Sequence, residues 1–236
     1  MMRLDKLLAH SGYGSRKDVS KLVKAKLVEV NGKVITKADY KIDEYNDEIV
    51  VDGFILEYVK NVYIMFNKPS GYVSASVDNV HPTVMDLIPE YNYLDLFCVG
   101  RLDLDTTGLL LITNDGSWAH SISNAKKKVE KEYHALIDGL LSTNNIANLE
   151  KGVIIENDYL TKPAKLKVIE NYDDTSLVSI IITEGKFHQV KQMFASQGFE
   201  VLKLHRSRIK NLELDKSLEF GDYTLLTDNQ IAELIL

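Results

Sequence analysis

Cysteine, proline and tryptophan are scarce in this chain of 236 residues, which has one cysteine, four prolines and one tryptophan. Because Cys98 has no second cysteine to pair with, an intramolecular disulfide is excluded and a cytosolic setting is expected. No apolar run approaches the roughly 20 residues that span a bilayer. The N-terminus has no apolar stretch followed by a small-residue cleavage site. We therefore expect neither a membrane span nor a secretion signal.

Metal-binding motifs are also missing. The histidines, at positions 10, 81, 120, 134, 188 and 205, are scattered along the chain. None of them stands at zinc-ligand spacing to another histidine or to Cys98. We therefore expect neither a structural nor a catalytic zinc.

Positive charge is unevenly distributed, although the whole chain has a formal net charge of −6. Residues 1–41 contain ten Lys and Arg against four Asp and Glu, and residues 42–58 contain six acidic residues and no basic one. Residues 183–210 again contain six basic residues against two acidic ones. Affinity for phosphate depends on the local field at the contact surface. The two basic segments are therefore candidate nucleic-acid contacts, with an ordinary solvated face as the alternative.

A small unit is predicted over residues 1–58. Residues 3–10 have leucines at helical spacing, and a Ser-Gly-Tyr-Gly break follows them. Ser15 is the predicted N-cap of a second helix. Alternating residues around Asn31-Gly32 predict a β-hairpin, and 48–51 a further strand. We expect two helices on a small sheet.

The larger region, residues 59–236, is predicted to be of the α+β class. Strands are expected at 62–66, 97–99, 109–113, 131–137, 165–170 and 177–183, and helices at 83–88, 144–150, 188–197 and 228–235. Consecutive strands without regular intervening helices favour a mostly antiparallel mixed sheet with flanking helices over a doubly wound one.

Two glycines bracket a polar loop between apolar strands. The segment Gly100-Arg101-Leu102-Asp103-Leu104-Asp105-Thr106-Thr107-Gly108 contains two carboxylates, an arginine and two threonines. Catalytic loops often have this placement on a rigid scaffold. On residue chemistry alone, Asp103 and Asp105 could equally cap a turn through backbone amides.

A second polar cluster begins where a strand is expected to end. In Glu184-Gly185-Lys186-Phe187-His188-Gln189-Val190-Lys191-Gln192, a helix is expected after Gly185. His188, Lys191 and Gln192 would share one face of this helix. On spacing alone, a lysine there is more often a solvated helix residue than a catalytic partner.

Together these segments resemble the RsuA/RluB-type pseudouridine synthases. Three motifs occur in the family's order: Gly100-Arg101-Leu102-Asp103 with Thr106 and Gly108, then Lys131-Glu132-Tyr133, then Glu184-Gly185-Lys186 with His188-Gln189-Val190-Lys191. Asn67-Lys68-Pro69-Ser70-Gly71 matches a further family segment, and residues 1–58 are similar to the S4 RNA-binding domain of many members. The segments His81-Pro82-Thr83-Val84 and Leu160-Thr161-Lys162-Pro163-Ala164 look closest to the branch that modifies 16S rRNA.

The resemblance implies that the protein isomerises a uridine in ribosomal RNA to pseudouridine. The bond from the ribose to N1 breaks, the base turns, and C5 bonds to the ribose. No cofactor is needed, which agrees with the absence of a dinucleotide or P-loop fingerprint. Because a stacked base cannot turn over, the uridine must be flipped into a pocket. The expected partner is 16S rRNA or a small-subunit assembly intermediate, bound by a cytoplasmic monomer that does not contact a membrane.

The family motifs also imply roles for individual residues. Asp103 is the expected catalytic carboxylate, Lys191 its ion-pair partner, and Tyr133 the residue that stacks on uracil and assists proton transfer at C5. The expected substrate-binding residues are Arg101, Thr106, His188, Leu204 and Arg206, with Arg206 and Arg208 as phosphate contacts. The expected RNA-binding residues of the S4-like unit are Arg3, Lys6, Arg16, Lys17 and Lys21.

Two positions depart from the family pattern. Lys210 stands where relatives usually have glycine, and Gln192 follows Lys191 where a second basic residue is common. These departures affect the local turn and one RNA contact.

Two other functions stay open: a 23S rRNA pseudouridine synthase of the same family, and a non-catalytic S4-type rRNA-binding assembly factor. An aspartate-dependent hydrolase is disfavoured because no second acid or metal site is evident.

Overall fold

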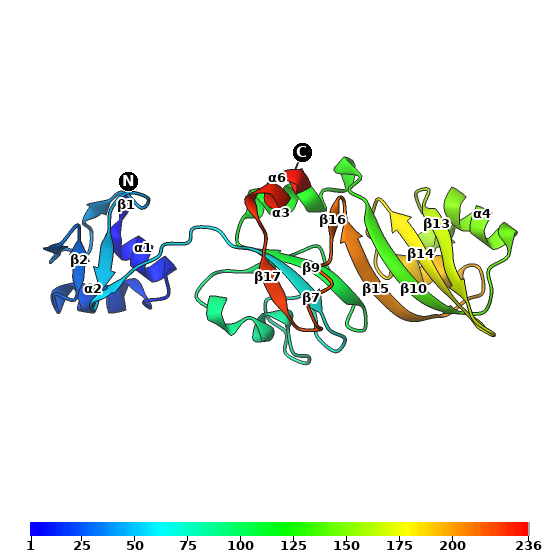
Figure 1. The fold of residues 1–236 in the computed structure, drawn as a ribbon, viewed down its shortest axis with the longest axis horizontal. Helices are drawn as coiled ribbons and strands as arrows, with labels where there is room; N and C mark the ends of the chain where they lie inside the picture. Colours follow the sequence, from blue (N-terminus) through cyan, green and yellow to red (C-terminus); the bar gives the residue numbers. More distant parts are fainter. Residues whose placement is uncertain (236) are drawn as a thin grey trace. The chain divides into compact units, whose positions relative to one another are not determined.

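The computed structural model describes residues 1–235, and Leu236 lies outside the described part. By its internal contacts the chain divides into two compact units. The first consists of Met1–Val62 with Ile88–Leu96, and the second of Tyr63–Leu87 with Phe97–Leu236 (Figure 1). Each unit contains its own hydrophobic core.

The first unit combines two helices with two small antiparallel sheets. α1 (Leu4–His10) is followed by α2 (Arg16–Lys24), which begins with the reciprocal hydrogen bonds between Ser15 and Asp18 that define a capping box. One sheet pairs β1 (Met2–Arg3) with β4 (Lys41–Ile42). The other has the order β3-β2-β5-β6 and consists of β2 (Val28–Val30), β3 (Lys33–Val34), β5 (Ile49–Val51) and β6 (Phe54–Ile55). The helical leucines and valines pack with the valines and isoleucines of the strands in one core.

A nine-stranded sheet dominates the second unit. Its strands follow the order β13-β14-β10-β15-β9-β7-β17, with β16 paired to β15 and β8 to β9. Their bounds are β7 (Tyr63–Lys68), β8 (Phe97–Val99), β9 (Thr107–Thr113), β10 (Lys131–Asp138), β13 (Lys165–Asn171), β14 (Thr175–Ile182), β15 (Val201–Ile209), β16 (Leu212–Glu213) and β17 (Tyr223–Leu225). Within this sheet every strand pair except β15–β9 is antiparallel. The predicted α+β class with a mostly antiparallel sheet is confirmed.

The parallel pair joins the two antiparallel halves of the sheet at a glycine. His205 and Arg206 of β15 lie opposite Thr107 and Gly108 of β9. Gly108 has a φ of +100°, and a Cβ at this position would lie 2.3 Å from the carbonyl oxygen of Arg206. Only a residue without a side chain permits this approach. Gly108 therefore brings the end of the polar loop directly against β15.

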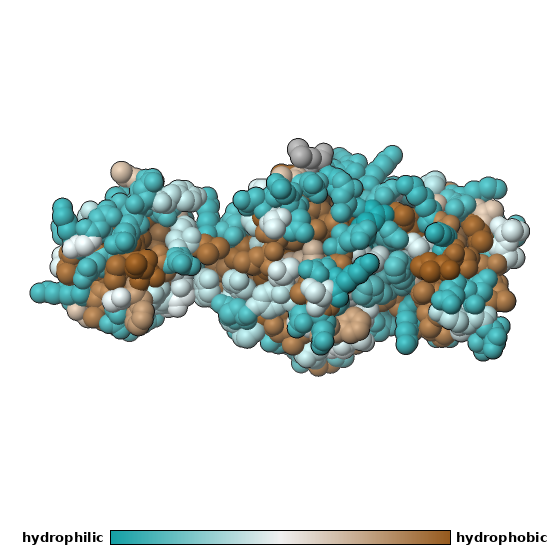
Figure 2. Space-filling model, viewed as in Figure 1, coloured by the Kyte–Doolittle hydropathy of each residue, from teal (hydrophilic) through white to brown (hydrophobic). Residues whose placement is uncertain are grey.

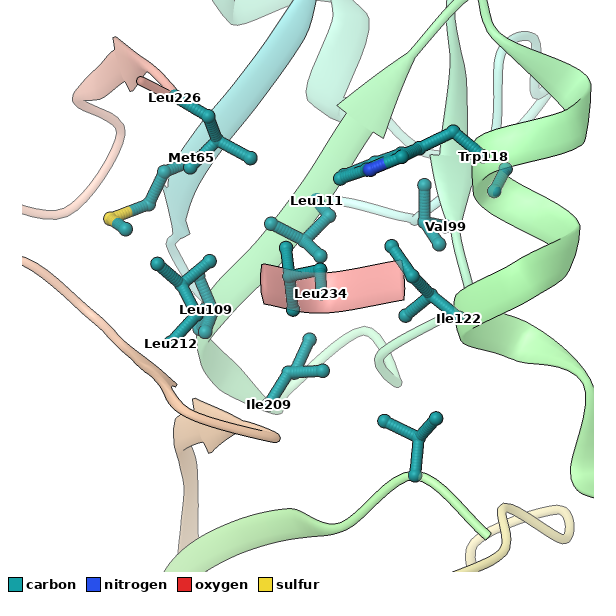
Figure 3. Packing of buried hydrophobic residues seen from close by; sticks show 12 residues of the cluster. Met65, Val99, Leu109, Leu111, Trp118, Ile122, Ile209, Leu212, Leu226 and Leu234 are labelled. Carbon is teal, nitrogen blue, oxygen red and sulfur yellow. The ribbon is translucent and has the colours of Figure 1, made fainter. Parts of the chain in front are cut away.

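Helices complete the second unit. α3 (Gly116–Ser123) contacts α6 (Asp228–Ile235), α4 (Thr143–Lys151) contacts β13, and α5 (Gln189–Ala195) contacts β15. Figure 3 shows Trp118 and Ile122 of α3 and Leu234 of α6 meeting Leu109 and Leu111 of β9 in one core. Short 3-10 helices lie at Val84–Leu87, Pro89–Tyr91, Ala125–Lys127 and Glu156–Asp158, and β11 (Ile154–Ile155) forms a hairpin with β12 (Tyr159–Leu160).

Some elements differ from the prediction. α3, β15 and β17 were not expected, and the helix predicted at 83–88 is the 3-10 helix Val84–Leu87. In β15 three basic side chains and a histidine interrupt the apolar alternation on which strand prediction depends. The helix expected over 188–197 begins only at Gln189, because His188 has a left-handed φ of +47°.

No helix within residues 1–235 is long and apolar enough to cross a bilayer. Hydrophilic residues cover most of the face seen in Figure 2, with hydrophobic patches between them. Scattered exposed apolar residues of this kind are normal on a folded protein.

Candidate active site

A cavity of about 380 Å³ lies in the second unit. Its lining comes from the loop before β9, from β10 and β15, and from the segment before α5, and includes Arg101, Asp103, Thr106, Tyr133, His188, Leu204 and Arg206. Of the residues predicted to be catalytic, to bind substrate or to contact phosphate, Lys191 and Arg208 are outside this lining. Segments far apart in the sequence therefore meet in one site.

The loop that presents Asp103 is held by a buried lysine. Lys68, at the end of β7, is 0% exposed. Its ammonium donates to the carbonyl oxygens of Pro69 at 3.0 Å, Asp103 at 3.0 Å, Leu104 at 3.2 Å and Thr106 at 2.9 Å. Burial lowers the pKa of Lys68 to about 8, although the nearby aspartates act in the opposite direction.

Sequence analysis did not assign Lys68 to the site. The available signal was a lysine that closes the apolar run of residues 62–66, where a charged side chain needs a buried partner. A serine adds a further restraint to the same loop, because Ser74 Oγ donates to Leu102 O at 3.0 Å and accepts from Leu102 N at 3.1 Å. The loop is thus fixed on both sides of the Asp103 side chain.

The Asp103 carboxylate faces two basic side chains. His188 Nε2 lies 3.5 Å from Oδ1, and Lys191 Nζ lies 3.9 Å from Oδ2. Lys191 makes its shorter contacts with Asp105, at 2.6 and 2.7 Å. Burial acts to raise the pKa of Asp105, but the hydrogen bonds and charge of Lys191 outweigh it, so this pKa is lowered. The Lys191 ammonium therefore lies between both aspartates, and its contact with Asp103, the predicted partner, is longer than its contact with Asp105.

The sheet contributes an aromatic ring and an arginine to the cavity. Tyr133 of β10 pairs in register with Arg206 of β15. Arg206 Nη1 donates to Tyr133 Oη at 3.4 Å, and Arg206 Nε donates to Leu109 O at 2.7 Å. Leu204, two residues before Arg206 on the same strand, is 6% exposed and completes the apolar wall. An aromatic ring beside an apolar wall suits a planar base.

Arg206 and Arg208, for which phosphate contacts remain a prediction, both have partners within the fold. Arg206 is 2% exposed, so a phosphate would have to leave water to reach it. Arg208 Nε donates to Glu132 Oε2 at 2.8 Å, and its Nη1 lies 3.6 Å from Glu130 Oε2. Both guanidinium groups therefore have roles within the fold.

The remaining predicted substrate residues differ in exposure. Arg101 is exposed at the cavity, whereas Thr106 is 1% exposed and its hydroxyl has no hydrogen-bond partner within the described residues. Lys131, which was quoted only as part of a motif, also lines the cavity and donates to Val129 O at 2.9 Å. Burial lowers the pKa of Lys131 to about 8, and the nearby charges of Arg206 and Lys162 act in the same direction.

Glu184 ties the segment before α5 to its neighbours. It is 4% exposed and accepts from Tyr159 Oη at 2.8 Å, from the Lys162 amide at 2.9 Å and from Gln189 Nε2 at 2.9 Å. These three donors satisfy a buried carboxylate. The segment that supplies His188 is thereby anchored.

The two departures from the family pattern have local structural partners. Lys210 has a left-handed φ of +53°, so the turn is present although its residue is not glycine. The Lys210 ammonium donates to Glu233 O at 2.7 Å. Gln192 Nε2 donates to Phe187 O at 2.9 Å, and Gln192 Oε1 accepts from the Glu156 amide at 2.9 Å.

In the first unit the predicted RNA-binding residues are not equivalent. Arg3 is paired with Asp5 at 2.7 Å, and Lys21 with Asp18 at 2.7 Å. The exposed residues Lys6, Arg16 and Lys17 form no ion pair within 4.0 Å among residues 1–235. The last three are therefore the freest cations of this group.

The site contains no arrangement that would bind a metal. Among residues 1–235, no group of three or more His, Cys, Asp and Glu side chains is placed to hold a metal ion. Burial raises the pKa of the Cys98 thiol to about 12, which keeps it protonated near neutral pH. Asp103, Tyr133 and the basic groups around them are the chemically capable residues of the cavity.

Comparisons with known proteins match both the N-terminal part and the larger part of the chain. The family model for RNA pseudouridylate synthase matches residues 62–196, and the S4 domain model matches residues 2–49. The RNA pseudouridine synthase YtzG of Bacillus subtilis is 44% identical over 98% of this chain and 97% of its own. Ribosomal small subunit pseudouridine synthase A of Haemophilus influenzae is 36% identical over 99% of this chain and 100% of its own.

A solved structure extends the similarity to three dimensions. The crystal structure of a pseudouridylate synthase, 36% identical, covers 99% of this chain and all (100%) of that chain with a TM-score of 0.68. The predicted resemblance, including the N-terminal S4 domain, is confirmed by these matches. The chain belongs to the RNA pseudouridine synthase family.

Proposed function

We propose that this pseudouridine synthase acts on a uridine of 16S ribosomal RNA with Asp103 as its catalytic carboxylate. The supporting observation is that the Asp103 carboxylate, with its side chain 27% exposed, lines the cavity beside His188 and Lys191. The cavity volume of about 380 Å³ suits one small ligand and not a duplex. The 16S target is supported by relatives named ribosomal small subunit pseudouridine synthase A.

The reaction conserves all atoms of the uridine. The N1–C1′ bond breaks, the uracil turns, a C5–C1′ bond forms, and the proton from C5 is lost while N1 gains one. The reaction needs the negative charge of the Asp103 carboxylate, whose oxygens lie 3.5 and 3.9 Å from the basic side chains of His188 and Lys191. Tyr133 would lie against the uracil face, where its hydroxyl can take part in proton transfer at C5.

Entry of the uridine requires that it leave its helix. The base edges needed for the reaction are blocked by stacking, so the nucleotide is flipped into the cavity. Arg101 is exposed at this cavity and has a planar guanidinium that can occupy the vacated place or contact the backbone. Action on ribosomal RNA would place the protein in the cytoplasm. We propose that it acts there as a monomer.

Asp103→Asn tests the proposed catalytic role. The substitution removes the charge but keeps the shape, so tritium release from C5-labelled uridine in RNA should fall by on the order of 10³-fold or more. Asp173→Asn, at an exposed turn outside the cavity, is the matched control and should retain wild-type activity. Normal tritium release by Asp103→Asn would refute the assignment.

The target is tested separately from the chemistry. Pseudouridine is mapped in 16S and 23S rRNA from cells with and without the gene. We expect one pseudouridine to disappear from 16S rRNA in the deletion strain and to return with the wild-type gene. Loss confined to 23S rRNA would assign the protein to the alternative target, and tight rRNA binding without any isomerisation would favour the non-catalytic factor.

A further inference from the structure

A second hollow adjoins the catalytic cavity. It has a volume of about 270 Å³ and is lined by Lys186, Phe187, Gln192 and residues of the β11–β12 hairpin. Lys186 and Phe187 also line the catalytic cavity. These two side chains therefore form a wall that both hollows share.

Phe187 presents an open aromatic ring at this wall. Its side chain is 65% exposed, and one face of its ring stacks on His188, with ring centroids 3.8 Å apart and an interplanar angle of 19°. His188 in turn lies 3.5 Å from Asp103. Because His188 supports the phenyl ring from one side, the ring is held in place while much of its surface stays accessible.

Gln192 holds the backbone below this ring. Its Nε2 donates to Phe187 O at 2.9 Å and to Glu156 Oε2 at 3.2 Å, and its Oε1 accepts from the Glu156 amide at 2.9 Å. The side chain therefore connects Phe187 to the hairpin on the opposite side of the second hollow. The residue that departs from the family pattern thus acts here as a positioning residue.

A cation and an anion determine where a phosphate could bind in the second hollow. Lys186 is exposed, and its ammonium lies 4.2 Å from the centroid of the Tyr159 ring. Glu156 lies on the hairpin side, where its carboxylate would repel a phosphate. Because Lys186 lines both hollows, a phosphate that it contacts would lie near the wall that they share.

A preformed aromatic face beside a lysine is the combination that binds single-stranded nucleotides. We propose that the second hollow is a subsite for the nucleotide adjacent to the target uridine, with its base stacked on Phe187 and its phosphate contacted by Lys186. This inference rests on the proposed function, since the catalytic cavity must hold the flipped uridine. It assigns Phe187 to RNA binding and Gln192 to its positioning.

The test measures binding and catalysis independently. The probe is a short oligoribonucleotide centred on the uridine that rRNA mapping identifies, labelled for fluorescence anisotropy, with tritium at C5 for a parallel release assay. Phe187→Leu should weaken binding by about tenfold, because one base loses its stacking partner. Phe187→Trp keeps a ring and should bind within about threefold of the wild type. Phe220→Leu removes an equally exposed ring (62%) outside both hollows and is the matched control.

An abasic nucleotide identifies the occupant. Placed on one side of the target uridine, it should weaken wild-type binding by about tenfold and cause no further loss in Phe187→Leu. Equal binding by Phe187→Leu and the wild type, or equal losses in both proteins at each neighbouring position, would overturn the subsite. If the wild type releases no tritium while its RNA binding still depends on Phe187, the proposed function alone is refuted.

Discussion

Lys68 illustrates how one side chain can order an active-site loop. Its ammonium donates to the carbonyls of Asp103, Leu104 and Thr106, and thereby holds the backbone of residues 103–106 at the proposed catalytic carboxylate. Loops are otherwise the most mobile part of a fold. Preorganisation of this loop means that Asp103 does not have to be ordered again in each catalytic cycle.

Lys68→Met tests this role. Methionine fills similar space but cannot donate, so the buried carbonyls lose their partner. We expect the free energy of unfolding to fall by about 3 kcal/mol. Tritium release should fall as well, because Asp103 is no longer held. Urea denaturation and the release assay measure both effects, with exposed Lys167→Met of β13 as control. Unchanged stability and activity would contradict the role of Lys68.

Lys131 makes stability depend on pH in the alkaline range. Its pKa is lowered from 10.5 to about 8 in the folded protein, so between these values the unfolded chain binds more protons. The free energy of unfolding contributed by Lys131 therefore rises with pH across this window. Because solvent reaches the cavity, we expect less than about 1 kcal/mol per pH unit. Urea denaturation of the wild type and Lys131→Met at several pH values should show a smaller rise in the variant; identical slopes would exclude Lys131 as the source.

At the level of the strands, the pairing of β9 with β15 determines the geometry of the site. β9 continues from the loop that supplies Asp103 and Thr106, whereas β15 supplies Leu204 and Arg206. Their short parallel contact at Gly108 and Arg206 brings these groups to one cavity. Tyr133 joins them because β10 pairs with β15 on its other edge.

Gly108→Ala should break this contact. The added Cβ would meet Arg206 O at 2.3 Å, and alanine is also strained at a φ of +100°. We expect a loss of at least about 3 kcal/mol in the free energy of unfolding, with loss of activity in the fraction that folds. Gly116→Ala at the start of α3 meets no atom within 4 Å and should be neutral or slightly stabilising. Urea denaturation of the two variants provides the comparison, and equal stability would contradict the argument.

The whole chain combines an S4 domain with a catalytic domain, and the first 41 residues have a local excess of positive charge. Residues 1–41 have ten basic against four acidic residues, although the full chain has a net charge of −6. Lys6, Arg16 and Lys17 are exposed in this segment. We therefore expect the N-terminal unit to add affinity without taking part in the chemistry.

Removal of residues 1–58 should weaken rRNA binding and flatten its salt dependence. The slope of log affinity against log salt should fall by roughly 0.7–0.9 for each phosphate contact that is lost. Lys6→Gln, Arg16→Gln and Lys17→Gln, combined in the full chain, should change the slope in the same direction while the unit keeps its core. Titration of rRNA fragments at several salt concentrations measures this effect. Unchanged affinity in both variants would exclude the predicted role.

Local patterns along the chain were sufficient for the fold class, the order of the motifs and the family. Leucine spacing, the cap at Ser15 and the Asn31-Gly32 turn act over a few residues, so they can be read without tertiary contacts. The family motifs also identified most of the residues that line the cavity. Elements without a clear hydrophobic period, such as α3 and the basic strand β15, were not predicted, because tertiary packing and not local preference stabilises them.

Contacts between distant segments decided the partners of the site residues. No spacing rule reveals that Lys191 lies closer to Asp105 than to Asp103, that Arg206 is buried beside Tyr133, or that Lys68 binds the loop carbonyls. These relations depend on strand register and on the approach at Gly108, where non-local packing brings residues about 100 positions apart into hydrogen-bond distance. Residue types indicate which chemistry is available, whereas burial and three-dimensional proximity determine which groups face the substrate.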